Sequence, residues 1–277
     1  MKRVLVIEDL ASLNAISGSV AITLLNAMQL HPAWLPSTIL STQSEGFGEP
    51  VGLSTDEYCR NTLDHWRKLA VRFNGLLVGY APSQFLDWLP SELTKLQPTN
   101  CLIDPVLGDD GQLYPTVDTS VIVRMQQLLP LATVITPNWT ELGFLVGENW
   151  EDEPNQAVLI HSAQEILREN PNLAVAITGV HLKNEIGVLF VAKGEVKFFG
   201  SPQVPGHFYG TGDVFSALLL GYLVQGQPLR NAVKAAQSGV SIAVSASVKL
   251  SGQERLDGLN LQPLLEKIVK GEISFEK

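Results

Sequence analysis

Short apolar runs alternate with longer amphipathic segments along most of this chain, and this alternation constrains the fold more than any other feature. The runs are rich in Val, Ile and Leu and have the length of buried strands. They cover residues 3–9, 75–80, 101–105, 132–138 and 173–179. Segments with helical spacing lie between them, at residues 17–30, 54–73, 83–93, 117–130 and 156–170. Strands that alternate with helices predict an α/β fold with a mostly parallel sheet covered on both faces.

Two local patterns add detail to this fold. Residues 185–200 contain two strand-like runs on either side of a Lys-Gly pair, which predicts a β-hairpin. Ser54 and Glu57 have the spacing of a capping box and predict a helix start. Helices are expected to dominate from residue 210 onward. We find no linker, low-complexity tract or repeat, and we therefore predict a single domain over residues 1–277.

Charge and composition exclude some classes of partner. The formal net charge is −9 and no basic patch offsets it, which argues against a nucleic acid or an anionic membrane surface as partner. A small anionic ligand stays compatible with this charge, because backbone amides bind phosphate. No apolar stretch reaches the ~18 residues of a membrane helix, and Glu8 and Asp9 interrupt the first apolar run too early for a signal peptide. Cys59 and Cys101 are far apart and are interpreted as buried thiols. We predict a cytoplasmic protein.

Several familiar catalytic motifs are missing from the sequence. It has no GxxxxGK[ST] phosphate loop, no GxGxxG after the first strand, no HExxH and no GxSxG. The scattered histidines are interpreted as surface or satisfied polar groups rather than zinc ligands: His31, His65, His161, His181 and His207. Polar residues at the ends of the predicted strands are therefore the candidates for function, because parallel sheets bind ligands at that edge.

The stretch Gly210-Thr211-Gly212-Asp213 opens an apolar helical run, although glycine is a poor helix former. Free backbone N–H groups at a helix start, where the dipole is positive, can hold a phosphate, and glycines let it approach closely. A carboxylate beside such an anion site suits phosphoryl transfer, in which it accepts the hydroxyl proton. The alternative is a tight loop with Asp213 as a first-turn partner of the helix dipole.

Two further clusters follow predicted strands. In "DPVLGDDGQLYP", Asp104 ends a strand and Asp109 and Asp110 lie in a loop, where carboxylates could hold Mg²⁺. A surface Asp-Gly turn is the alternative for this loop. In "TPNWTEL", Asn138 and Glu141 have the spacing of a helix N-cap and its N3 residue, a structural account that requires no chemistry.

Taken together and in this order, these clusters resemble the ribokinase-like superfamily, and more narrowly the bacterial pyridoxal (vitamin B6) kinases. The landmarks are "LLVGY", "DPVLGDDGQLYP", "TPNWTELGFLVG", "ITG" and "GTGDVFSALLLGYL", with "LSTQSEGFG" as a weaker match. They run from roughly residue 4 to residue 245. The resemblance implies a three-layer α/β/α fold with a mostly parallel central sheet and a small β-hairpin. It also implies ATP-dependent phosphorylation of the 5′-hydroxymethyl group of pyridoxal, pyridoxamine or pyridoxine.

The resemblance also implies roles for individual residues. Asp213 would be the base, and the amides of Gly210, Thr211 and Gly212 would form the anion hole for the transferred phosphoryl group. The implied magnesium and nucleotide ligands form a second group. Asp109 and Glu141 would hold Mg²⁺ with Asp104 and Asn138 in support, and Thr178, Gly179 and Asn138 would contact ATP. The implied substrate pocket contains Asp9, Ser12, Ser44 and Tyr80 together with Asp213.

Departures from the family pattern fall on the substrate side, at Asn14, Gln43, Glu45 and Tyr209. They leave open a hydroxymethylpyrimidine kinase of thiamine synthesis, whose substrate is also a small heteroaromatic alcohol. A non-catalytic homologue that binds vitamin B6 or nucleotide is a further alternative. The resemblance implies Mg²⁺ with ATP as co-substrate and a homodimer, and it leaves open whether a monovalent cation assists.

Overall fold

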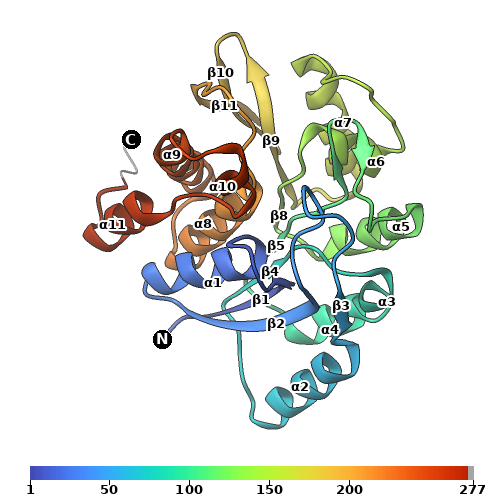
Figure 1. The fold of residues 1–277 in the computed structure, drawn as a ribbon. Coiled ribbons are helices and arrows are strands. Elements are labelled where there is room, and N and C mark those ends of the chain that lie inside the picture. Colours follow the sequence, from blue (N-terminus) through green and yellow to red (C-terminus); the bar gives the residue numbers. More distant parts are fainter. Residues whose placement is uncertain (274–277) are drawn as a thin grey trace.

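A nine-stranded sheet runs through the computed structural model, which describes residues 1–273 (Figure 1). Its strand order is β11-β10-β9-β8-β5-β4-β1-β2-β3. The strands are β1 (Arg3–Ala11), β2 (His31–Leu40), β3 (Gly52–Ser54), β4 (Gly75–Val78), β5 (Asn100–Ile103), β8 (Val134–Ile135), β9 (Ala174–Leu182), β10 (Glu185–Ala192) and β11 (Glu195–Pro202). The strands from β2 to β9 in this order are mutually parallel, and β3, β10 and β11 pair antiparallel at the two edges. A separate small hairpin consists of β6 (Gly108–Asp109) and β7 (Gln112–Leu113).

Helices cover both faces of the sheet and complete three layers (Figure 1). One face is covered by α2 (Asp56–Lys68), α3 (Ser83–Leu86), α4 (Leu89–Leu96), α5 (Thr119–Leu128), α6 (Trp139–Val146) and α7 (Gln156–Glu169), with the 3₁₀ turn η1 (Leu129–Leu131) after α5. The other face is covered by α1 (Ser17–Ala27), α8 (Thr211–Gln225), α9 (Leu229–Ser247) and α11 (Gln262–Lys270). The short helix α10 (Gly252–Leu256) precedes α11. This architecture confirms the predicted α/β fold, including the hairpin of β10 and β11.

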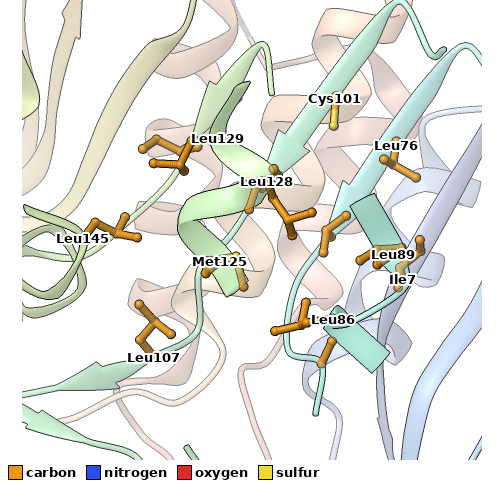
Figure 2. Close-up of a cluster of buried hydrophobic side chains, with 14 of the residues drawn as sticks. Ile7, Leu76, Leu86, Leu89, Cys101, Leu107, Met125, Leu128, Leu129 and Leu145 are labelled. Carbon is orange, nitrogen blue, oxygen red and sulfur yellow. The ribbon is translucent and has the colours of Figure 1, made fainter. Parts of the chain in front are cut away.

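Strand β1 shows why its residues are apolar almost without interruption. Leu5 and Ile7 point to the core on the α2–α7 face, whereas Val4 and Val6 point to the core under α1 and α8. A strand covered on both faces needs apolar side chains at consecutive positions. Figure 2 shows the first of these cores, in which Ile7 lies among leucines from β4, α3 and α4. Cys101 on β5 belongs to the same core, and both predicted buried thiols are buried and free.

Strand β2 was not predicted from the sequence, because it contains Pro32 and Pro36 and proline is unusual within a strand. Proline cannot donate to a strand ladder and is tolerated where its nitrogen faces away from a partner. Both prolines pair with β1 on one side, whereas β3 begins to pair with β2 only at Thr38. The proline-containing half of β2 is therefore an edge on its outer side, where a missing N–H costs no ladder bond.

The capping box predicted at Ser54 is wrong. Ser54 is the last residue of β3, and helix α2 begins after Thr55, whose side chain does not cap the helix. The Thr55 hydroxyl instead donates a hydrogen bond to the Pro36 carbonyl at 2.6 Å, so a tertiary contact replaces the local one.

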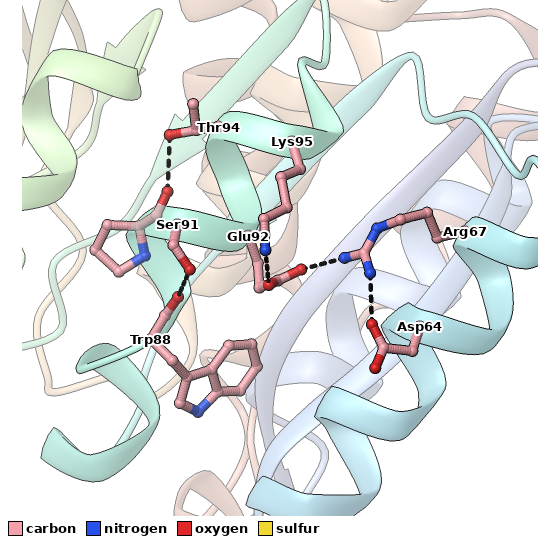
Figure 3. Close-up of polar contacts among 8 residues, drawn as sticks. Asp64, Arg67, Trp88, Ser91, Glu92, Thr94 and Lys95 are labelled. Carbon is pink, nitrogen blue, oxygen red and sulfur yellow. Dashed lines mark hydrogen bonds and ion pairs between the residues drawn. The ribbon is translucent and has the colours of Figure 1, made fainter.

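Charged side chains join α2 to α4 at the surface (Figure 3). Arg67 contacts Glu92 and also Asp64, and Lys95 lies 2.6 Å from Glu92. Exposed ion pairs of this kind contribute little to stability, typically about 0–1 kcal/mol. The core rather than this network holds the two helices in place. Within residues 1–273, no helix has the length and apolar composition needed to cross a membrane.

Candidate active site

The carboxyl ends of the parallel strands meet at one edge of the sheet, as the topology requires. A cavity of about 490 Å³ lies there, between this edge and the amino ends of helices α1 and α8, and we name it the strand-end cavity. The sequence-predicted residues that line it are Asp9, Ser44, Tyr80, Asp104, Asp109, Asn138, Glu141, Thr178, Gly179, Gly210, Thr211, Gly212 and Asp213. Ser12 does not line it, since this residue is exposed beyond the end of β1. The structure therefore brings together all of the predicted site residues except Ser12.

Helix α8 begins at the strand-end cavity as predicted. Its N-cap is Gly210, with φ 84°, a left-handed conformation that favours glycine. No side chain in the described part of the chain caps this helix. The first intrahelical bond runs from the Val214 N–H to the Gly210 carbonyl at 3.1 Å, so the N–H groups before Val214 have no acceptor within the helix. These donors and the positive end of the helix dipole form a site for an anion.

Asp213 is the third residue of α8, and its carboxyl group also lies at the start of α1. Its Oδ2 accepts a hydrogen bond of 2.7 Å from the Ser17 N–H, the first residue of α1. Burial raises the pKa of Asp213 above its usual value, and the bond from Ser17 opposes that rise. A buried carboxylate with a raised pKa is a better proton acceptor near neutral pH than an exposed one. Two helix starts therefore converge on one carboxylate beside the anion site.

Asp104 lies next to this carboxylate at the end of β5. Its Oδ2 accepts a bond of 2.8 Å from the Ser216 hydroxyl, and the Thr136 and Ser216 hydroxyls are 2.9 Å apart. The pKa of Asp104 is raised to about 7, mainly by burial; the bond from Ser216 opposes this rise and the neighbouring charge of Asp213 contributes to it. Ser216 on α8, together with Thr136 just after β8, thus holds this carboxyl group in one orientation.

The third predicted cluster forms the complete capping box that its spacing predicts. The Asn138 side chain accepts a bond from the Glu141 N–H at 2.8 Å, and Glu141 Oε2 accepts one from the Asn138 N–H at 2.9 Å. The other carboxylate oxygen, Oε1, accepts a bond from the Leu107 N–H at 2.9 Å. Burial and, to a smaller extent, the charge of Asp104 raise the pKa of Glu141 to about 8.

Asp109 lies in the β6–β7 hairpin, which the sequence presented as a loop. The turn residues Asp110 and Gly111 both have positive φ, 48° and 75°, as a tight Asp-Gly turn requires. The Asn138 amide donates to the Gly108 carbonyl at 2.8 Å and lies 3.5 Å from Asp109 Oδ1. This bond attaches the hairpin to the capping box. The position of the hairpin is compatible with both interpretations made from the sequence, a surface Asp-Gly turn and a loop whose carboxylates hold Mg²⁺.

The carboxylates of this region fit a magnesium ion that arrives with a nucleotide. Within residues 1–273, no group of three or more His, Cys, Asp or Glu side chains is arranged to hold a metal ion alone. Magnesium at nucleotide sites is usually bound by one or two carboxylates, with phosphate and water oxygens completing its shell. Asp109 and Glu141 line the same cavity, and the pKa of each is raised first by burial. The two carboxylates offer hard oxygen ligands, and a magnesium ion would relieve the repulsion between them. They are therefore a suitable donor set for this ion.

The family of the chain follows from comparison with known proteins. The family model described as phosphomethylpyrimidine kinase matches residues 80–256, which contain the α8 start, the Asn138 capping box and the β6–β7 hairpin. The chain belongs to the phosphomethylpyrimidine kinase family. The crystal structure of pyridoxal kinase from Lactobacillus plantarum is similar to this chain, with a TM-score of 0.91 and 31% sequence identity, and the match covers 98% of each chain. The predicted resemblance to pyridoxal kinases and the predicted ribokinase-like fold are confirmed.

The curated relatives of this chain include pyridoxal kinases and hydroxymethylpyrimidine/phosphomethylpyrimidine kinases. A pyridoxal kinase from Arabidopsis thaliana is 32% identical over 167 residues, covering 54% of this chain and 50% of the relative. A hydroxymethylpyrimidine/phosphomethylpyrimidine kinase from Haemophilus influenzae is 34% identical over 150 residues, covering 52% of this chain and 54% of the relative. The matched region thus spans about half the length of these relatives.

Thr178 and Gly179, which the resemblance assigns to the nucleotide, lie within β9. The Thr178 N–H donates to the Pro137 carbonyl at 2.9 Å, and Thr178 forms an isolated parallel bridge with Asn138. Gly179 has φ 68°, and no atom lies within 4 Å of the position that a Cβ would occupy. Backbone in this conformation, open to the cavity, leaves room for a phosphate.

Among the residues that the resemblance assigns to the substrate, burial raises the pKa of Asp9 to about 7, and a hydrogen bond with Ser17 opposes that rise. Tyr80 is half-buried at the end of β4, and Ser44 lies in the segment after β2. Asn14, one of the departures from the family pattern, is buried and donates to the Leu256 carbonyl at 3.2 Å. Gln43 contacts the same carbonyl. These two departures therefore attach the loops after β1 and β2 to α10.

Three residues of the strand-end cavity and its surroundings were missed by sequence reasoning: Glu8, Ser17 and Ser216. Ser17 and Ser216 lie in helices whose sequences carry no sign of their distant partners. Glu8 did carry a signal, because a glutamate at the end of an otherwise apolar buried strand needs an explanation.

Proposed function

We propose that this protein transfers the terminal phosphoryl group of ATP to the 5′-hydroxymethyl group of pyridoxal, pyridoxamine or pyridoxine. The observation that carries the proposal is the start of α8, where uncapped backbone donors and the half-buried carboxylate of Asp213 line one cavity. Family membership and the likeness to the Lactobacillus plantarum pyridoxal kinase support it.

In this proposal Asp213 accepts the proton of the substrate hydroxyl as its oxygen attacks phosphorus. The Ser17 N–H holds Oδ2, which leaves Oδ1 for the substrate. The raised pKa of Asp213 favours proton transfer at neutral pH. The amides of Gly210, Thr211 and Gly212 stabilise the charge that develops on the transferred group, because preorganised donors at a helix start need no reorganisation. General-base assistance of this kind contributes about 10²–10⁴-fold to a rate.

Magnesium would be held by Asp109 and Glu141, with Asp104 in support, and it would neutralise phosphate charge. Other protein residues would hold these carboxylates in position. Asn138 connects the β6–β7 hairpin to α6, so the carboxylates keep their spacing. Thr178 and Gly179 would contact the nucleotide phosphates through open backbone within β9.

The substrate ring would lie between the ends of β1 and β4. Asp9, Tyr80 and Ser44 line that part of the strand-end cavity. Ser12 would reach a substrate only if the loop after β1 moved inward, since its side chain is exposed. The predicted single domain, homodimer and cytoplasmic location stay predictions.

A second candidate is phosphorylation of hydroxymethylpyrimidine. The matched family description and the name of the Haemophilus influenzae relative favour it. Comparing kcat/KM for pyridoxal, pyridoxamine, pyridoxine and hydroxymethylpyrimidine with Mg-ATP decides between the two. A preference for a vitamin B6 compound supports our assignment, and a clear preference for the pyrimidine overturns it. Absence of ADP release with all four at high enzyme concentration would favour a non-catalytic binder.

A further inference from the structure

The strand-end cavity is strongly acidic. Eight carboxylate side chains line it, and none of its lining residues in the described chain is Lys or Arg. The two histidines among them have other acidic neighbours: His181 bonds to Glu153, and His207 lies near Glu45 and Asp109. Magnesium accounts for carboxylates near the β6–β7 hairpin. It does not account for those at the end of β1.

Glu8 is the carboxylate that the proposed mechanism leaves without a role. It lies one position after Ile7 on β1, and its side chain occupies the space beside Gly79, where a Cβ would come 2.5 Å from Oε1. Its neighbouring charges are Asp213, Asp104 and Asp9. Glu8 therefore belongs to the proposed substrate end of the cavity, next to the base.

The protein supplies no hydrogen bond to one oxygen of the Glu8 carboxyl group and surrounds the group with other acids. The residue is only 2% exposed, and Oε2 has no hydrogen-bond partner among residues 1–273. Buried polar atoms without a partner are rare, because such an atom has lost its hydrogen bonds to water. Neighbouring acids add repulsion rather than relief. A bound group that carries positive charge and N–H donors would supply both missing interactions.

We propose that Glu8, with Asp9 beside it, selects acceptor alcohols that carry a positively charged amino group. A bulge in the pairing of β1 with β2 lies between Glu8 and Leu10, and both consecutive carboxylates line the cavity. Among the proposed substrates, pyridoxamine has a protonated aminomethyl group where pyridoxine has a hydroxymethyl group. This inference rests on the proposed function and deepens it by naming the substrate class.

A charged pair in a buried site discriminates strongly against a neutral partner. Hydrogen bonds to charged groups contribute about 1.5–3 kcal/mol, which corresponds to about 10–150-fold in an equilibrium constant. We therefore expect the wild-type protein to prefer pyridoxamine to pyridoxine at least tenfold in kcat/KM. Pyridoxal, which has no amino group, should behave like pyridoxine.

The variant Glu8→Gln tests the inference, because it keeps the side-chain shape and removes the charge. We expect kcat/KM for pyridoxamine to fall at least tenfold, mainly through KM, and that for pyridoxine to change less than about threefold. The control is Glu57→Gln, the same substitution on the exposed surface of α2, which should leave the preference unchanged. An unchanged preference in Glu8→Gln overturns the inference.

The wild-type protein alone also tests the inference if Glu8→Gln fails to fold. Equal turnover of pyridoxamine and pyridoxine by wild type refutes the selection and leaves the proposed kinase function intact. If no vitamer is phosphorylated, the proposed function fails, and calorimetric binding of the two compounds without nucleotide tests the selection by itself. Tighter binding of pyridoxamine supports it, and equal binding or no binding of either contradicts it.

Discussion

Replacing Gly212 with alanine adds one methyl group at the point where we expect the phosphoryl group to lie. Gly212 is the second residue of α8 and lines the strand-end cavity. Apart from its chain neighbours and the helix backbone, the only heavy atom of residues 1–273 within 4 Å of the added Cβ is Asp104 Oδ2, at 3.8 Å, which is an ordinary contact. Its φ is not in the left-handed range, unlike that of Gly210. The protein therefore has room for this methyl group, whereas a phosphate at the amides would compete with it.

The expected effects on stability and activity have opposite signs. Alanine in a helix is favoured over glycine by about 0.5–1 kcal/mol, because glycine loses more backbone entropy on folding. With about 2.1 cal/mol/K per residue, the unfolding entropy of the 277-residue chain is about 0.6 kcal/mol/K, so Tm should rise by about 1–2 °C. Displacing the phosphoryl group by about 1 Å should lower kcat/KM about 100-fold.

Thermal unfolding and steady-state kinetics on the same preparation measure both effects. Gly252→Ala is a matched control, since Gly252 begins the exposed helix α10 and nothing lies within 4 Å of its added Cβ. It should stabilise similarly and leave turnover unchanged. Activity of Gly212→Ala within about twofold of wild type would refute phosphate binding at this amide. A fall in Tm of several degrees would contradict the open space that the structure shows.

Three other predictions concern groups around the fold. Ser216→Ala removes the hydroxyl that donates to Asp104 and should lower the free energy of unfolding by about 1–3 kcal/mol in urea titrations; an unchanged midpoint would contradict the bond. Asn155→Ala removes the side chain that caps α7 and should cost about 1 kcal/mol while leaving kcat/KM at the wild-type value, so lost activity would speak against a purely structural role. Burial raises the pKa of Cys59 to about 11 and of Cys101 to about 12, so a thiol reagent at pH 8 should label neither cysteine before unfolding and both afterwards.

Features that depend on a few neighbouring residues were predictable from the sequence. The start of α8 at Gly210 follows from glycine at a left-handed cap, and the Asn138–Glu141 capping box follows from a spacing of three residues. The edge of the sheet that collects the site followed from parallel strands alone. The local pattern gave a wrong capping box at Ser54, because the helix begins after Thr55 and the Thr55 hydroxyl bonds to a distant strand instead of its own helix.

The contacts that orient the candidate site were not predictable, because they join residues far apart in the chain. Ser17 and Asp213 are separated by 196 positions, and Asp104 and Ser216 by 112. Ser17 has φ 50°, a left-handed conformation that a serine rarely adopts and that no local pattern announces. Only the docking of α1 against α8 brings its N–H to the carboxylate.

The rate of phosphoryl transfer by Asp213→Asn tests the central claim most directly. Asparagine keeps an oxygen that can accept the Ser17 N–H bond, so the fold and nucleotide affinity should be preserved while the proton acceptor is lost. We predict a fall in single-turnover rate of about 10²–10⁴-fold at saturating Mg-ATP and vitamer, with the Kd for ATP changed less than about threefold. A rate within a few-fold of wild type would show that this carboxylate does not take the hydroxyl proton.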